Sequence, residues 1–191
     1  MNDRAPAPGG LALVQTLVNT LDLASGADSL DTADGLARLG LAPDEVPGAR
    51  ELRESLRAVC LAHAGHPAHA AVTPLGELLA RAPLRLTVDE HDGGARLTPA
   101  GNADTSTDPN SRNSPGSSGS SGSSAAQVPL PSRIAVAVAE SLVEGTWPRL
   151  KACEAPDCHW AYYDRSPAGR GRWCSMSVCG ARAKMRRYRA K

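Results

Sequence analysis

Four cysteines near the end of the chain are the residues best suited to do chemistry. They form two Cys-x4-Cys pairs separated by fifteen residues, and they are Cys153, Cys158, Cys174 and Cys179. Two close pairs of thiolates are typical of a tetrahedral Zn²⁺ site, because each short loop presents two sulfurs to one metal ion. The spacing therefore predicts one structural zinc ion bound by all four cysteines.

Other uses of these cysteines remain open at this point. Two disulfides agree with their number, but the N-terminus lacks the pattern of a signal peptide, so we expect a cytoplasmic protein with reduced thiols. A catalytic zinc needs an open coordination position, which four cysteines normally close. Any zinc–thiolate centre can also act as a redox switch. His159 is an alternative to one of the four cysteine ligands. The fifth cysteine, Cys60, lies on an apolar helical face, where we expect a buried, inert thiol.

The segment around the cysteines has a physical need for a metal ion. Residues 149–191 contain few aliphatic side chains, and a module of this size rarely folds on a hydrophobic core alone. Zinc binding contributes on the order of 10 kcal/mol to folding in small zinc peptides. We therefore expect zinc to hold this module together.

The same segment is strongly basic. Residues 149–191 hold eleven Arg and Lys against three Asp and Glu, a net charge of +8, whereas residues 1–148 hold ten against seventeen, a net charge of −7. Such asymmetry indicates a module that binds a polyanion. Nucleic acid, as duplex DNA, is the expected partner. The predicted contacts are Arg165, Arg170, Arg172, Arg182, Lys184, Arg186, Arg187, Arg189 and Lys191.

The last of these cations are expected on a helix that begins between the second pair of cysteines, capped by Ser175 or Ser177. Ala181, Met185 and Tyr188 follow at i, i+4 and i+7 and make a narrow apolar stripe. We expect the helix to dock by this stripe and to present cations on both flanks. An ordinary solvated helix in an Arg-rich chain, and a basic tail for an acidic protein, are the alternatives.

The rest of the chain is expected to form a helical domain that positions this module. Apolar periodicity and breakers predict helices over residues 11–23, 33–39, 49–64, 69–82 and 131–145. Residues 84–98 alternate around a Gly-Gly turn and predict a β-hairpin. The Gly/Ser-rich stretch 101–126 is expected to be a flexible linker. The predicted fold is mainly α with a small β-hairpin, divided into a domain over 11–148 and a finger over 149–191.

Other candidates for chemistry are weaker. His63, His66 and His69 recur every three residues, but Pro67 interrupts them, so we interpret them as exposed turn histidines. The acidic residues around His91 are interpreted as a solvated hairpin tip. Asn19 and Asp22 suit either a ligand pocket or the polar flank of a core helix. No nucleotide-binding or hydrolase motif is present, so no enzyme activity is expected, and no apolar run is long enough to span a membrane.

The C-terminal motifs resemble a known family. Trp173–Met176, then Cys179-Gly180-Ala181-Arg182 and the basic run to Tyr188, resemble the CGNR zinc-finger proteins of bacteria, which are described as stress-induced transcription regulators. These proteins carry a mainly helical ABATE domain before the finger, and Val18–Asp22 is similar to a short signature near its start. One position departs, because Ala181 stands where the family has its namesake Asn.

The resemblance implies a zinc-dependent DNA-binding regulator in which the N-terminal domain senses a signal or a partner. The missing Asn concerns base-specific recognition rather than zinc binding. Alanine has high helix propensity, so the fold is not threatened. The alternative function is an interaction module whose basic finger binds an acidic protein or RNA.

Overall fold

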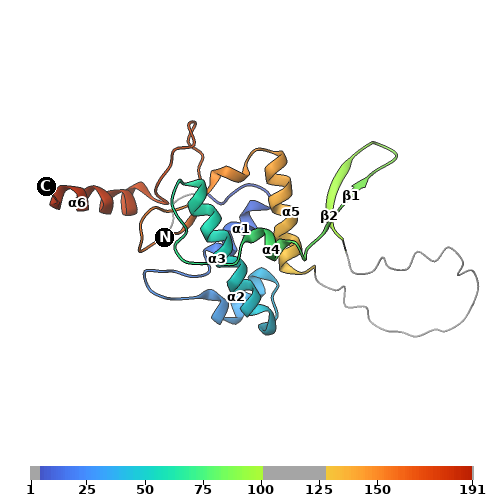
Figure 1. Cartoon of the computed structure of the whole chain (residues 1–191), viewed down its shortest axis with the longest axis horizontal. Helices are drawn as coiled ribbons and strands as arrows, with labels where there is room; N and C mark the ends of the chain where they lie inside the picture. The colour runs from blue at the N-terminus through green and yellow to red at the C-terminus, as the bar shows by residue number, and fades with distance from the viewer. Residues whose placement is uncertain (1–4, 101–127, 191) are drawn as a thin grey trace, which may run out of the picture.

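The computed structural model describes residues 5–100 and 128–190. A group of helices forms the middle of the molecule, a β-hairpin extends from one end, and the C-terminal helix extends from the other (Figure 1). The predicted linker, residues 101–126, and the predicted contact Lys191 lie outside the described residues. The predicted fold class, mainly α with a small β-hairpin, is confirmed.

Three helices make the centre of the body. Helix α1 (Leu11–Val18) packs its apolar face against both α3 (Val46–His63) and α5 (Leu130–Val143). A Cβ atom on Gly10 would lie 2.8 Å from the Cβ of Ala137. Glycine at this position therefore permits a close approach of α1 to α5. Residue 134, an isoleucine, is fully buried in the same cluster, as expected for a helix that packs back onto the N-terminal helices.

The second helix forms where its capping residues predict it. Helix α2 spans Ala33–Leu39, the Thr32 hydroxyl accepts a hydrogen bond from the Gly35 N–H, and Gly40 ends the helix in a left-handed conformation. Thr32 and Gly40 thus act as the N-cap and C-cap that these residue types favour.

Two predicted helices are shorter than expected. The first ends at Val18 rather than near residue 23, because the Asp22 carboxylate accepts hydrogen bonds from the Ala24 N–H and the Ser25 hydroxyl and stabilises a turn instead. The predicted helix over 69–82 is reduced to α4 (Leu75–Leu79). The residues directly before α4 have no regular secondary structure, and Ser55 of α3 donates a hydrogen bond to the Thr73 carbonyl among them.

The two hairpins in the described residues differ in burial. Strand β1 (Leu84–Val88) pairs antiparallel with β2 (Ala95–Pro99), and most of this hairpin is exposed. Strand β3 (Leu150–Ala152) pairs antiparallel with β4 (Ala161–Tyr163), and all six residues are buried. The alternating pattern predicts only the first hairpin.

The main hydrophobic core continues from the helices into the cysteine module. Leu150, Ala161 and Tyr163 of the second hairpin belong to the same cluster as Leu11 and Leu17 of α1. A second, smaller cluster surrounds the four cysteines. The body and the first half of the module therefore share one core. No helix in the described part of the chain combines the length and the apolar character that crossing a membrane requires.

Candidate metal centre and basic helix

The four predicted ligands arrive from two separate loops. Cys153 directly follows β3, and its N–H donates to the Trp160 carbonyl at 3.0 Å. Cys158 lies in the tight turn that returns to β4, with its N–H bonded to the Ala155 carbonyl. Cys174 ends a long loop, and Cys179 lies in a π-helical turn, residues 176–180. Backbone hydrogen bonds thus fix the positions of the first pair.

The structure brings all four sulfurs together. Their Sγ atoms all lie within 4.8 Å of one another. The Cys158–Cys174 and Cys174–Cys179 sulfurs are each 3.7 Å apart. Zn–S bonds of about 2.3 Å in a tetrahedron place sulfurs about 3.8 Å apart, so these separations match a zinc site. They are too long for the S–S bond of about 2.05 Å in a disulfide.

The electrostatics of the cluster disfavour four thiolates unless a cation is bound among them. Hydrogen bonds from Cys158 and Cys174 lower the pKa of the Cys153 thiol. Hydrogen bonding to Cys153 raises the pKa of Cys158 and of Cys174, and burial raises that of Cys179. One thiolate is therefore favoured, whereas four would repel one another. A divalent ion that replaces the remaining protons resolves this conflict.

The donor set fits one structural zinc ion. Four soft thiolates close a tetrahedral site and leave no position for a substrate. His159, the alternative ligand, instead has its ring edge-on to that of His69, with centroids 5.8 Å apart. Cys60 is fully buried far along α3, and burial raises the pKa of its thiol to about 12, as expected for an inert core residue.

An ion pair holds the loop between the two cysteine pairs. Lys151 Nζ lies 3.1 Å from Asp164 Oδ2, and their side chains are 7% and 0% exposed. Asp164 also accepts hydrogen bonds from the N–H groups of Ser166 and Gly171. Although burial raises the pKa of Asp164, these bonds together with Lys151 lower it to about 2. The carboxylate therefore stays ionised and acts as a hub for the loop.

Side-chain amides join the module to α1. Asn19 Oδ1 accepts a hydrogen bond from the Ala161 N–H at 2.7 Å, and Asn19 Nδ2 donates one to the Ala161 carbonyl at 2.9 Å. Gln15 donates to the same carbonyl at 3.2 Å. On α3, a ring nitrogen of His63 lies 2.8 Å from the Leu150 carbonyl. The helical domain thereby satisfies backbone groups of β3 and β4 that would otherwise lack partners.

These junction residues were not predicted as a site. Asn19 appeared only as a candidate pocket residue within the Val18–Asp22 signature, and Ala161 carries no chemical signal at all. His63, interpreted as an exposed turn residue, is half-buried on α3 and has a partner. The contacts join residues between 87 and 146 positions apart, so no local pattern indicates them.

The basic helix forms at the predicted place. Ser175 accepts a hydrogen bond from the Val178 N–H, and the π-helical turn that follows continues into α6 (Ala181–Arg189). At the departing position, Ala181 is exposed and its N–H donates to the Met176 carbonyl. Alanine therefore leaves no buried polar group unpaired there.

The prediction that α6 docks by its apolar stripe is wrong. Met185 is 50% exposed and Tyr188 is 78% exposed, and Ala183 supplies the buried contact instead. The helix extends away from the body after the π-helical turn, so its later turns, which carry Met185 and Tyr188, stay exposed. Figure 1 shows α6 extending from the body with only its first turn close to it.

The predicted nucleic-acid contacts fall into two groups. Three have partners within the protein: Arg165 donates to the carbonyls of Ala5 and Pro6, Arg172 pairs with Glu154, and Arg182 lies 3.9 Å from Asp157. The other predicted contacts that the structure describes are exposed and form no ion pair within the described part of the protein. They are Arg170, Lys184, Arg186, Arg187 and Arg189.

Comparison with protein families accounts for nearly all of the chain. Residues 11–145 match the ABATE family, described as "putative stress-induced transcription regulator". Residues 149–191 match the CGNR zinc finger, which includes the four-cysteine cluster. A comparison with curated proteins finds no match.

Proposed function

This chain belongs to the family whose members join an ABATE domain to a CGNR zinc finger, and from that premise we propose that it is a zinc-dependent regulator that binds duplex DNA through α6. In this proposal the finger contacts DNA and the helical domain receives a signal. It assigns the chain no catalytic role and a cytoplasmic location.

The observation that carries the proposal is the free cationic surface of α6. Its unpaired cations are Lys184, Arg186, Arg187 and Arg189, all exposed. With its side chains, an α-helix is about 10–12 Å in diameter and the major groove is about 12 Å wide, so α6 fits within the groove. Cations without internal partners keep their full charge available for phosphates.

The internally paired arginines have a different role in this proposal. Arg172 and Arg182 lie beside the cysteine cluster and pair with acidic residues of the first cysteine loop. Such pairs connect the two halves of the finger at its surface and leave less of the arginine charge available to DNA. Arg170, exposed on the long loop, is the one cation outside α6 that we assign to phosphate contact.

The zinc ion and the junction with α1 give α6 a fixed base. Cys179 lies one turn before the helix, and Ala161 is bonded to Asn19 of the helical domain. A change in the helical domain would therefore move the base of α6. This connection supports a role for the ABATE domain in controlling DNA binding.

The test is a salt series with matched charge variants. Binding of the zinc-loaded protein to random-sequence duplex DNA is measured across ionic strength for wild type and for Arg186→Gln/Arg187→Gln. We expect the variant to bind more weakly and to lose about 2 from the slope of log K against log salt. The control, Arg81→Gln/Arg96→Gln, removes the same charge from exposed sites outside the finger and should match wild type. Absence of salt-dependent DNA binding in wild type would refute the proposal.

A second candidate function is recognition of RNA or an acidic protein. The exposed stripe of Met185 and Tyr188 on a basic helix favours it, because DNA phosphates give an apolar face no partner. The same titration with single-stranded RNA of equal length distinguishes the two. Tighter binding to RNA than to duplex DNA, with Tyr188→Ser weakening it, would favour this second candidate.

A further inference from the structure

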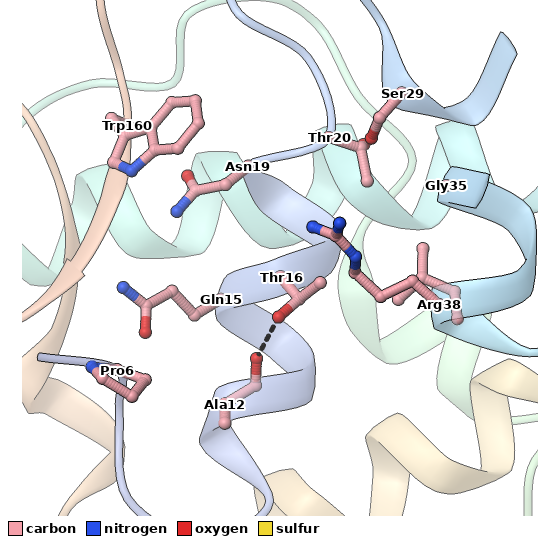
Figure 2. Close-up of a pocket in the computed structure, with 11 residues that line it drawn as sticks. Pro6, Ala12, Gln15, Thr16, Asn19, Thr20, Ser29, Gly35, Arg38 and Trp160 are labelled. Carbon is pink, nitrogen blue, oxygen red and sulfur yellow. Dashed lines mark hydrogen bonds between the residues drawn. The ribbon is translucent and has the colours of Figure 1, made fainter. Parts of the chain in front are cut away.

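A hollow lies at the junction between the helical domain and the finger. It is formed by α1, the loop that follows α1, α2 and the residue that precedes β4, and its volume is about 300 Å³ (Figure 2). Ligand pockets in proteins span about 300–1,000 Å³, so this one suits a small organic molecule. Asn19 and Asp22 were the two candidate pocket residues in the sequence; Asn19 lines this hollow, whereas Asp22 does not.

The floor of the hollow is made of groups whose hydrogen bonds are already formed. Asn19 and Gln15 both hold Ala161 of the finger. The Thr16 hydroxyl donates to the Ala12 carbonyl at 2.7 Å, and the Thr20 hydroxyl donates to the Leu17 carbonyl at 2.9 Å. These side chains are held in place before any ligand arrives, which reduces the entropy cost of binding.

Arg38 gives the hollow its charge. Among the residues that line it, Arg38 is the only one with a formal charge, and no lining residue is acidic. Within the described residues its guanidinium has neither a hydrogen bond nor an ion pair. Figure 2 shows this side chain reaching from α2 across the hollow toward Thr20 and Asn19. A free guanidinium aimed into a polar pocket is suited to bidentate binding of a carboxylate.

Trp160 supplies an aromatic wall. Its indole lies on the other side of Asn19 from Arg38 in Figure 2. The indole N–H has no partner among the described residues, and the ring is only partly buried. An aromatic face is suited to stacking with a planar group, and its N–H offers one further donor. The hollow thus has a cation at one side and an aromatic surface at the other.

We propose that this hollow binds a small planar organic carboxylate, with the carboxylate on Arg38 and the planar body against Trp160. The inference rests on the proposed function in one respect, since it gives the signal received by the helical domain a site. Trp160 directly precedes Ala161, so a ligand between Trp160 and Arg38 would connect β4 of the finger to α2. Binding would thereby bias the position of the finger against the helical domain.

The test follows the ligand at Trp160 itself, without DNA. The full zinc-loaded chain is titrated with benzoate and with uncharged benzamide while the three indole N–H signals are recorded by ¹H–¹⁵N NMR. The Trp160 signal is assigned from a Trp160→Phe variant. We expect saturable shifts with benzoate at concentrations up to about 10 mM, tenfold above a Kd of about 1 mM, and at least tenfold weaker binding of benzamide.

Variants test whether benzoate binding depends on the charge of Arg38 rather than on the overall charge of the protein. Arg38→Gln should weaken benzoate binding at least tenfold, and Arg38→Lys should restore part of it. Arg96→Gln, an exposed arginine on the β1–β2 hairpin, should bind like wild type. The proposal is overturned if benzoate leaves the Trp160 signal unmoved, if benzamide binds equally well, or if Arg38→Gln binds unchanged. Because no DNA is present, failure here would leave the role of α6 standing, and failure of DNA binding would leave this site standing.

Discussion

The two halves of the cysteine module are held in opposite ways. In the first half, β3 and β4 are fully buried, and their backbone and side-chain groups are bonded to α1, α3 and the Asp164 hub. In the second half, α6 has one buried residue, Ala183, and most of its cations have no partner. The four cysteines lie at the boundary and join the two halves through one metal site.

This difference separates residues that maintain the fold from residues that are available to a partner. Substitutions in the first half should cost stability and affect binding only indirectly. Substitutions in α6 should change binding and leave stability unaffected. Substitutions of both kinds therefore test that division.

Loss of a zinc ligand should have the largest effect. Cys174→Ser is expected to abolish stoichiometric zinc binding and to unfold the finger, because metal binding in such modules contributes on the order of 10 kcal/mol. Metal analysis and near-UV circular dichroism measure the two effects. Cys60→Ala is the matched control, since it removes a buried thiol that is not a ligand and should retain one zinc per chain. A folded, metal-free Cys174→Ser protein would contradict a structural role for zinc.

Removal of the buried carboxylate should have the next largest effect. Asp164→Asn leaves Lys151 as a buried charge without its partner, which costs about 3–5 kcal/mol in comparable cases. Denaturant unfolding of the zinc-loaded protein measures the loss. Asp157→Asn is the control, because Asp157 is exposed and lies 3.9 Å from Arg182. If both variants lose equal stability, the Asp164 hub does not hold the loop.

The same carboxylate predicts a dependence on pH. The pKa of Asp164 falls from 3.8 to about 2 on folding, so its contribution is fully present above pH 4 and is lost as the pH falls through 2. A shift of this size corresponds to about 2 kcal/mol. Because acid also releases zinc from thiolates, the measurement is the stability difference between wild type and Asp164→Asn. That difference should shrink as the pH falls from 4 to 2.

Breaking the contact between α1 and the finger should have an intermediate effect. Asn19→Ala leaves the buried Ala161 N–H without an acceptor, and an unpaired buried group costs about 1–3 kcal/mol. Hydrogen exchange of the Ala161 amide reports the loss locally, and denaturant unfolding reports it globally. Thr16→Ala, on the same helix but bonded only within it, serves as the control. Unchanged protection of Ala161 in Asn19→Ala would show that the finger is held by its other contacts alone.

Substitutions in α6 should have the smallest effect on folding. Arg186→Gln/Arg187→Gln should change the free energy of unfolding by no more than about 0.5 kcal/mol, as surface substitutions usually do. Thermal unfolding of the zinc-loaded protein measures this. A large loss of stability would mean that α6 packs against the body, and the division between the two halves would not hold.

The cysteine site and several helices follow from the sequence because local residue types determine them. Two Cys-x4-Cys pairs indicate a tetrahedral thiolate site wherever the rest of the chain lies. Thr32 and Gly40 determine the ends of α2 through bonds within a few residues. The β1–β2 hairpin follows from its alternating residue types around a Gly-Gly turn, although Leu86 and Val88 of β1 are exposed in the structure. For these features, the information lies within the segment itself.

The remaining features depend on contacts between distant segments. The strands Leu150–Ala152 and Ala161–Tyr163 are three residues long and buried throughout, so their sequences show no alternation of apolar and polar residues. Hydrophobic periodicity therefore cannot predict the β3–β4 hairpin. The Asn19–Ala161 pair spans 142 positions. The stripe of Met185 and Tyr188 has the spacing of a packed face, yet spacing cannot show whether a second surface exists for it to pack against.

The hydrogen bonds from Arg165 to the carbonyls of Ala5 and Pro6 have a practical consequence for anyone who labels this protein. They hold the start of the described chain against the finger, and the described chain ends at the tip of α6 (Figure 1). An affinity tag or fluorophore fused to either terminus would therefore crowd the surface under test. The β1–β2 hairpin lies on the opposite side of the body from α6, which makes it the better place for a reporter.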